Sequence, residues 1–252
     1  MNEAAHCLHM HTPPDPTTMP LYRLGTLEYG FPPVEEALED PNGLLAVGGD
    51  LSPERLLLAY RHGIFPWFNK DDPICWWSPD PRCVFFTAEF KPSRSLARHL
   101  RQNAFHFSVD RCFTRVMEAC AGPRHYADDT WIQPELITNY TLLHKAGVAH
   151  SVEVWNTDNE LVGGLYGLNL GRLFFGESMF SHATDASKAA FVYLMQLCRH
   201  WQIPLVDAQM ESDHIMSLGA TLIPRHEFTA WLERCADLPA PDWRQAPPFS
   251  HS

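Results

Sequence analysis

The segment SVEVWNTDNELVGGLYGLNLGRLFFGESMF (residues 151–180) has the pattern of three consecutive β-strands. The polar run 156–160 and the pair Gly171-Arg172 supply the turns that separate the strands. Strands joined by such short turns pair as antiparallel hairpins. The segment therefore predicts a mostly antiparallel sheet at the centre of the fold. The expected strands are 151–155, 161–170 and 173–180.

Helices and strands alternate on both sides of this segment. A strand at 83–86 and a helix capped by Ser93 precede it, and a helix at 187–201 follows with an apolar face of period 3.6. The order indicates an α+β fold that would suit an acetyltransferase-like (GNAT-type) domain. The tail after Pro239 is proline-rich and is expected to be loose. The remaining expected elements are a strand at 204–209, a helix at 215–220, a strand at 221–224 and a helix at 227–236.

The N-terminal third has a different composition. Residues 1–20 are rich in Pro, Thr and His without any period, which predicts a disordered extension. Residues 21–81 are expected to form a small N-terminal domain, with one helix that Ser52-Pro53 begins and Gly63 ends. The proline-rich run at 76–81 marks its boundary, so 82–252 is the expected catalytic domain of acetyltransferase-like fold.

Composition restricts the function. The net charge is −11, so any contact with RNA must be local, because non-specific nucleic-acid binders are basic. No apolar run approaches the ~20 residues of a membrane span, and no signal peptide is recognisable. The seven cysteines are widely spaced without a C-x-x-C pair, which favours reduced thiols and a cytoplasmic location.

A basic stripe stands out in this acidic chain. Its arginines recur at helical spacing on one face, with a lysine just before them. The stripe is either an ordinary solvated face or a nucleic-acid contact. Its members are Lys91, Arg94, Arg98 and Arg101.

Two short stretches break the rules of their strands. Gly176-Glu177 interrupts an aromatic strand; the glycine predicts a bulge or a close approach, and the glutamate either faces water or is buried with partners. Asp207 and Gln209 lie two apart at a strand end, where they either cap the next loop or hold and deprotonate an amine. The neighbouring pair Asp213-His214 suggests a nucleophilic relay, but no serine or cysteine stands in a nucleophile elbow.

Several long motifs, in one order along residues 29–232, resemble the leucyl/phenylalanyl-tRNA–protein transferase family. Within the family's Asp-Cys-Gln run, this chain has Ala208 in place of cysteine. The matching runs are PNGLLAVGGDL (41–51), RHGIFPWF (61–68), WWSPDPR (76–82), TWI (130–132), GESMFS (176–181), DAQ (207–209), DH (213–214) and SLGA (217–220).

The resemblance implies an aminoacyltransferase of the N-degron pathway. Such an enzyme moves Leu, Phe or, less readily, Met from aminoacyl-tRNA to the α-amine of proteins that begin with Arg or Lys. It uses no acetyl-CoA, ATP or metal, so no cofactor is expected, and neither DNA nor a membrane is an expected partner. The chain also lacks the Arg/Gln-x-x-Gly-x-Gly/Ala loop with which acetyltransferases bind the CoA pyrophosphate.

The resemblance also implies site residues. Asp207 and Gln209 form the catalytic pair, with Asp207 acting on the amine directly or through Gln209, or with the substrate ribose assisting. Glu177 contacts the aminoacyl-adenosine or the incoming amine. Trp67 and Trp131 stack on the terminal adenosine or, alternatively, belong to the core, and the basic stripe binds the acceptor stem. The implied side-chain pocket consists of Leu165, Phe174, Met179, Phe191 and Val206.

Two other classes compete with this interpretation. One is an acyl-CoA-dependent N-acyltransferase on the same fold, which tight CoA binding would support. The other is a non-catalytic tRNA-binding adaptor, which would use the basic stripe but would not turn over.

Overall fold

The structure is a computed structural model that describes residues 21–25, 30–102, 105–122 and 130–250. The predicted extension at 1–20 lies outside the described residues. The chain forms a mixed α/β structure with two sheets, and no helix of the described residues is long and apolar enough to cross a membrane. No disulfide bond joins the cysteines of the described ranges.

The larger sheet has seven strands in the order β11-β5-β10-β9-β8-β7-β6. Its centre is the predicted pair of hairpins, in which β7, β8 and β9 run antiparallel. The sheet is mostly antiparallel as expected, but β9 and β10 pair in parallel across the crossover helix α5. Its strands are β5 (Arg82–Phe86), β6 (His106–Val109), β7 (Ala149–Trp155), β8 (Leu161–Leu170), β9 (Leu173–Ser181), β10 (Leu205–Gln209) and β11 (Thr221–Ile223).

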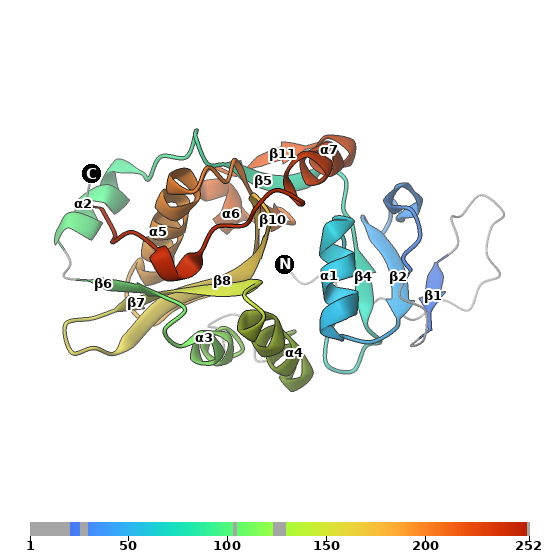
Figure 1. Ribbon diagram of the computed structural model, residues 1–252, viewed down its shortest axis with the longest axis horizontal. Coiled ribbons are helices and arrows are strands. Elements are labelled where there is room, and N and C mark those ends of the chain that lie inside the picture. The colour runs from blue at the N-terminus through green and yellow to red at the C-terminus, as the bar shows by residue number, and fades with distance from the viewer. Residues whose placement is uncertain (1–20, 26–29, 103–104, 123–129, 251–252) are drawn as a thin grey trace.

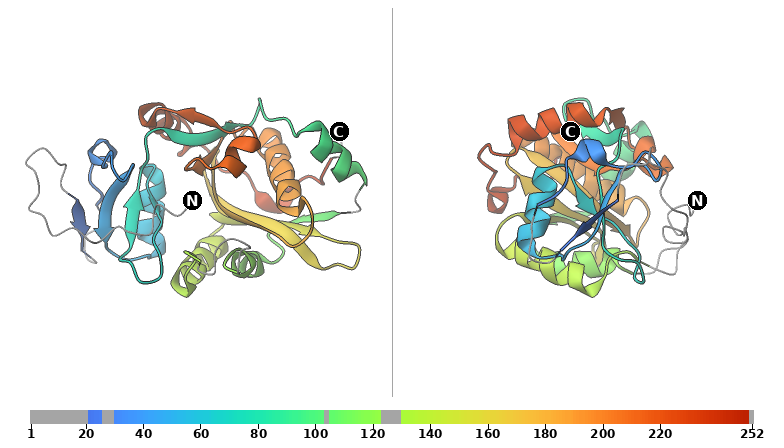
Figure 2. Two further views of the ribbon diagram at one scale, coloured as in Figure 1. Left: turned by 180° about the vertical axis from the view of Figure 1, so that it is seen from behind. Right: turned by 90° about the vertical axis from the view of Figure 1, so that its right-hand side faces the viewer.

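Helices cover both faces of this sheet (Figures 1 and 2). The helix α5 packs on β7, β8 and β9 from one side, where ten of its residues are buried, while α3 packs on these strands and α4 packs on β7 from the other side. The helix α2 begins after Ser93, whose Oγ accepts a hydrogen bond from Leu96 N at 3.2 Å, as predicted. These helices are α2 (Arg94–Gln102), α3 (Phe113–Cys120), α4 (Pro134–Lys145), α5 (Ala186–His200), α6 (Asp213–Ser217) and α7 (Arg225–Cys235).

The smaller sheet lies at one end of the molecule, with α1 between it and the larger sheet (Figure 1). Ser52 caps α1 and Pro53 occupies its first turn, as the sequence predicts. Tyr60 of α1 packs edge-on against Phe175 of β9, and one continuous core includes residues of both sheets. The strand order is β1-β2-β4-β3, with α1 at Pro53–Arg61, β1 at Tyr22–Leu24, β2 at Leu44–Gly48, β3 at Phe65–Pro66 and β4 at Cys75–Trp77.

The C-terminal tail corrects one expectation. The sequence predicts a loose segment after Pro239, yet Trp243 is only 4% exposed and its Nε1 donates a hydrogen bond to Asn169 Oδ1 at 2.8 Å. The ring of Phe249 stacks on Phe107 at 4.1 Å. The prolines limit regular structure in this tail, but its aromatic residues still bury themselves against the sheet and α5.

Candidate active site

A pocket of about 270 Å³ opens where β8, β9 and β10 meet α5 and α6. Apolar side chains line one part of it, and three polar side chains gather at another. The apolar lining includes Phe85, Leu165, Met179, Phe191, Leu194, Val206 and Ile215, and the polar group is Glu177, Asp207 and Gln209.

Glu177 reaches this pocket because β9 bulges at its position. Tyr166 pairs with Ser178 and Gly167 pairs with Gly176, so Glu177 is the extra residue on β9. A Cβ at Gly167 would lie 2.1 Å from Phe175 O, so only glycine permits this pairing. The bulge that Gly176 predicts is confirmed, and it turns a glutamate out of an aromatic strand toward the pocket.

Three side chains from distant parts of the chain donate hydrogen bonds to Glu177. Tyr60 Oη donates to Oε1 at 2.6 Å, Gln209 Nε2 donates to Oε1 at 2.7 Å, and Tyr140 Oη donates to Oε2 at 3.2 Å. The two tyrosine hydroxyls are themselves 2.5 Å apart. The glutamate is therefore buried with partners, and its carboxylate joins α1, α4 and β10 in one network.

The environment raises the pKa of Glu177 from 4.5 to about 7. Burial is the largest cause, and the negative charge of Asp207 adds to it, whereas the hydrogen bonds from Tyr60, Tyr140 and Gln209 oppose the shift. Although Glu177 keeps some exposure at the pocket, dense protein surrounds its carboxylate. Such a pKa lets a carboxylate exchange protons near neutral pH.

Asp207 lies beside this network but is bound to Arg82. Arg82 Nε donates to Oδ1 at 2.8 Å, Nη2 donates to Oδ2 at 2.6 Å, and the backbone N of Gln209 donates to Oδ1 at 2.8 Å. Its side chain is 1% exposed. With both oxygens engaged by a bidentate arginine, Asp207 is suited to fix the end of β10 rather than to meet a substrate.

The side chain of Gln209 points toward Glu177 because the end of β10 is irregular. Asp207 pairs with Val84 and Gln209 with Cys83, which leaves Ala208 as an extra residue, and Gln209 has φ of 65°. A left-handed backbone is costly for a residue other than glycine and is found where the surroundings impose it, often at functional sites. The turn sends the amide to Glu177 while Asp207 keeps Arg82.

Four of the five residues expected to form the side-chain pocket line it, namely Leu165, Met179, Phe191 and Val206. Leu165 and Met179 are direct cross-strand partners. Phe174 is not among the lining residues; it is fully buried, with its ring 5.5 Å from that of Trp243. Because the tail was expected to be loose, the sequence offered no partner for Phe174 outside the pocket.

The tryptophans and the basic stripe lie away from the pocket lining. Trp67 and Trp131 are partly buried and pack against the core, and the rings of Trp67 and Trp77 meet edge-on at 5.7 Å. The stripe is exposed on and just before α2, at the end of the molecule opposite the smaller sheet (Figure 1). The structure therefore brings neither group into contact with Glu177.

Sequence reasoning missed three residues of this site as functional groups: Arg82, Tyr60 and Tyr140. Each lies more than 30 residues from its carboxylate partner, so no local pattern connects them. Their only signal is chemical, since a buried carboxylate requires donors. His214 also borders the pocket, but Ser217 Oγ donates to its backbone O at 2.7 Å, and within the described ranges no hydrogen bond joins its imidazole ring to a serine or cysteine side chain, which leaves the relay unsupported.

Two family models, one for each part of the chain, match this protein and carry related descriptions. A family model described as "Leucyl/phenylalanyl-tRNA protein transferase" matches residues 84–233, and one described as "Leucyl/phenylalanyl-tRNA protein transferase N-terminal domain" matches residues 49–80. The protein named leucyl/phenylalanyl-tRNA–protein transferase in Azotobacter vinelandii is 58% identical over 84% of this chain and 94% of its own length. The protein of that name in Pseudomonas aeruginosa PAO1 is 54% identical over 86% of this chain and 95% of its own.

Among solved structures, L-PGS from Bacillus licheniformis superposes with a TM-score of 0.38 and 13% identity over 67% of this chain and 53% of that one, a likeness too weak to define the fold. The sequence matches define the protein as a transferase enzyme. It belongs to the leucyl/phenylalanyl-tRNA protein transferase family.

Proposed function

We propose that this enzyme moves Leu or Phe, and Met less readily, from aminoacyl-tRNA to the α-amine of proteins that begin with Arg or Lys, and so marks them for degradation in the cytoplasm. The observation that carries this proposal is a single pocket with an apolar part and a glutamate whose pKa is raised to about 7. The family's name supplies the donor, and the pocket supplies a place for its side chain and for an amine.

The apolar lining suits unbranched and aromatic aminoacyl groups. Met179 is flexible and polarisable, so it can adapt to Leu, Phe or Met. Such a pocket can distinguish a side chain branched at Cβ only by shape, through a lining that includes Leu165, Phe191 and Val206. We therefore expect poor transfer of Ile and Val.

Glu177 is the residue that we assign to proton transfer. An α-ammonium group with a pKa of about 8 is mostly protonated at neutral pH and must lose a proton before it can attack. Glu177 takes that proton, and the free amine attacks the ester carbonyl carbon. The C–O bond to the ribose then breaks, and the ribose oxygen leaves with a proton from the amine, directly or through the vicinal hydroxyl.

Gln209 and Asp207 act as positioning residues in this scheme. Since Gln209 Nε2 donates to Glu177, its Oε1 is left to accept a hydrogen bond from the incoming amine. Asp207 fixes Gln209 through its backbone N and through Arg82. This favours the indirect route through Gln209 over direct proton transfer to Asp207.

The negative charge of the site also favours an acceptor protein whose N-terminal residue is basic. Glu177 and Asp207 place two carboxylates at the pocket, and only Asp207 is paired with a cation. An N-terminal Arg or Lys brings a compensating positive charge to this part of the site. The chain's net charge of −11 acts in the same direction at longer range.

The division of the chain and the fold of its second part belong to the same proposal. We take 21–81 as the N-terminal domain and 82–252 as an acetyltransferase-like domain. The supporting feature is a sheet that changes from antiparallel hairpins to the parallel pair β9-β10 across α5. Trp67 and Trp131 remain our candidates for stacking on the terminal adenosine, and the stripe on α2 for binding the acceptor stem.

The decisive experiment transfers labelled Leu or Phe from tRNA to a protein that starts with Arg. We expect product that disappears after ribonuclease treatment and with a protein that starts with Asp. Product formed from acyl-CoA instead would establish the acyl-CoA reaction. Binding of aminoacyl-tRNA without product would establish the adaptor. Either result would overturn the proposal.

A further inference from the structure

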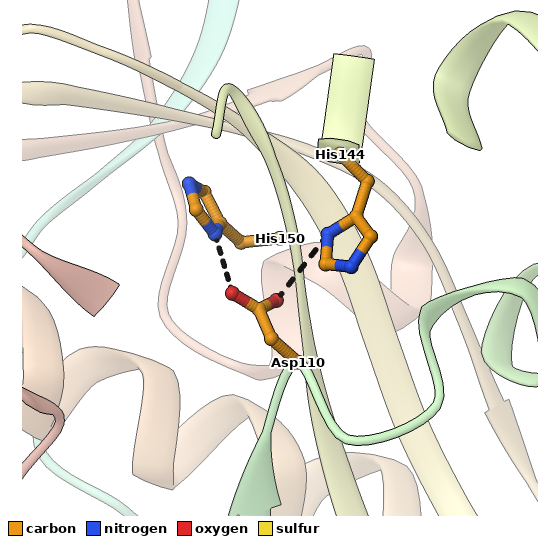
Figure 3. A group of neighbouring side chains, drawn as sticks. All are labelled: Asp110, His144 and His150. Atoms are coloured by element: carbon orange, nitrogen blue, oxygen red, sulfur yellow. Dashed lines mark hydrogen bonds and ion pairs between the residues drawn. The ribbon is translucent and has the colours of Figure 1, made fainter. Parts of the chain in front are cut away.

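Asp110, His144 and His150 meet where β6 and α4 end and β7 begins, and none of them lines the pocket (Figure 3). Asp110 follows β6, His144 lies in the last turn of α4, and His150 is the second residue of β7. One ligand atom from each lies within 4.8 Å of the others. The three residues thus join three elements that are separate in the sequence.

Both ring nitrogens of His150 face oxygen atoms in this cluster. Its Nε2 lies 3.2 Å from Gly147 O, and in the tautomer that donates to this carbonyl the lone pair is on Nδ1. Its Nδ1 lies 2.7 Å from Asp110 Oδ2, which is also an acceptor. In that tautomer the Nδ1 lone pair and the carboxylate oxygen face the same point, where one metal ion can bind both atoms.

His144 has a similar arrangement. Its Nδ1 donates to Ala149 O at 2.9 Å, so a neutral ring keeps a lone pair on the other nitrogen. Histidines that bind metals commonly donate their second ring N–H to a carbonyl, which fixes the tautomer and the orientation of the ring. His150 meets that condition as it stands, whereas His144 meets it with Nε2 as the ligand once its ring turns from the position in which Nδ1 lies 3.8 Å from Asp110 Oδ1.

The surroundings fix all three side chains. Asp110 Oδ1 accepts a hydrogen bond from Ser151 N at 2.8 Å. The ring of His144 stacks on Phe113 at 4.4 Å, and the ring of His150 stacks on Trp243 at 4.2 Å. Such support preorganises ligands and lowers the cost of ordering them when an ion binds.

We propose that Asp110, His144 and His150 form a binding site for a divalent transition metal of the zinc class. Two imidazoles and one carboxylate are a common ligand set for zinc, whereas Mg²⁺ and Ca²⁺ prefer oxygen ligands. Metal–ligand bonds of about 2.1 Å would require the 2.7 Å contact between His150 and Asp110 to open slightly. Three protein ligands leave a position for water.

The bound ion would act on the helix that borders the active site. His144 lies one turn after Tyr140 on α4, and Tyr140 donates to Glu177. A metal that ties the end of α4 to β7 would hold Tyr140 in place. The proposal does not depend on the proposed function, because metal binding is measured without transfer.

The test is zinc and cobalt binding to the full chain after removal of metal by a chelator. All samples carry substitutions of the four potential chelators near the N-terminus, which are His6→Gln, Cys7→Ser, His9→Gln and His11→Gln. We expect one equivalent of zinc to bind and to raise the melting temperature, and Co²⁺ to give a visible ligand-field absorption band.

Two variants and one control make the result specific. Asp110→Asn keeps an oxygen for Ser151 N, and His144→Gln changes a partly exposed residue, so each should fold. We expect both to weaken zinc binding at least about tenfold and to abolish the rise in melting temperature. His200→Gln removes an exposed histidine outside the cluster and should bind as the parent does.

Zinc binding that is equal in all four proteins, or absent from the parent, would overturn the proposal. Equal stabilisation by Mg²⁺ or Ca²⁺ would also overturn it. Circular dichroism on each variant confirms that a loss of binding is not a loss of fold.

Discussion

Arg82 binds both carboxylate oxygens of Asp207, at 2.8 Å and 2.6 Å, and neither side chain is more than 1% exposed. The guanidinium also donates to Gly63 O at 3.0 Å and lies between the rings of Phe65 and Phe228. One arginine therefore connects the segment after α1 with β10 and α7. The pair is part of how the chain assembles its pocket.

Breaking this pair should cost much more stability than breaking an exposed one. Arg82→Met leaves the carboxylate of Asp207 buried without a cation, and we expect a loss of about 3–5 kcal/mol. Arg61–Asp237 is a matched control, since its distance is also 2.6 Å but its side chains are 49% and 82% exposed. Arg61→Met should cost less than about 1 kcal/mol. Urea denaturation measures both; similar losses would show that Arg82 is not needed for Asp207.

Replacing Glu177 should change the rate and its pH dependence. With a pKa of about 7, Glu177 is an active base only when deprotonated, so the wild-type rate should rise through neutral pH. Glu177→Gln should lower single-turnover transfer by about 10²–10⁴-fold and remove the inflection. Glu153→Gln alters another buried glutamate that does not border the pocket, and should stay within about threefold of wild type. A wild-type rate in Glu177→Gln would instead favour proton transfer by the substrate ribose.

The same residue should make stability depend on pH. Its pKa in the folded state, about 7, lies above its ordinary value of 4.5, so the folded protein binds the proton more tightly. The stabilisation is complete below about pH 4.5 and is lost as the pH rises through about 7. As the pH rises between these limits, the free energy of unfolding of Glu177→Gln should increase relative to that of wild type by on the order of 1–2 kcal/mol. This figure is discounted because the carboxylate contacts solvent in the pocket. Chemical denaturation at pH 5 and pH 8 tests this, with the exposed Glu233→Gln as control. A difference between wild type and Glu177→Gln that does not change with pH would contradict the burial argument.

The apolar lining should set the choice of amino acid. Ile-tRNA should support kcat/KM at least about tenfold below Leu-tRNA, because an apolar pocket discriminates by shape within roughly 10–200-fold. Met179→Ala should narrow this difference by making room beside Leu165. Met195→Ala also empties a buried position on α5, but outside this pocket, and should leave the ratio unchanged. Equal use of Ile and Leu by the wild-type enzyme would refute the assignment of the pocket.

The basic stripe on α2 should affect the binding of aminoacyl-tRNA and not the rate of the transfer step. Arg94→Glu with Arg98→Glu should raise KM for aminoacyl-tRNA and flatten its salt dependence, because fewer phosphates are neutralised. Transfer from a minimal aminoacyl-adenosine donor should not change. Arg111→Glu with Arg115→Glu reverses another exposed pair four residues apart and is the control. A slower minimal reaction in the α2 variant would place the stripe in the active site instead.

Much of the larger sheet could be predicted from local pattern. The strand at 161–170 matches β8 at both ends, and the helix expected at 187–201 is α5 within one residue at each end. The parallel pairing of β9 with β10 could not be predicted, because it depends on how α5 returns the chain. The tail after 239 was misjudged because prolines signal irregular backbone but say nothing about aromatic burial.

The candidate site, like the fold, could be predicted from the sequence only in part. Gly176 marked the irregularity of β9 from the sequence, whereas the spacing of Asp207 and Gln209 predicted a regular strand with both side chains on one face, and the register shift between them corrects that expectation. Which carboxylate is free and which is paired depends on Arg82, Tyr60 and Tyr140, and these residues come from other elements. Sequence reasoning alone therefore gave Asp207 the leading role, and the contacts shift that role to Glu177.

The amino-acid sequence by itself determined the family, the central hairpins and the residue types of the pocket, because these follow from long motifs and from periodicity along one chain. Only the tertiary structure decided the protonation chemistry. A pKa depends on burial and on neighbours in space, and the neighbours of Glu177 lie as much as 117 residues away in the chain.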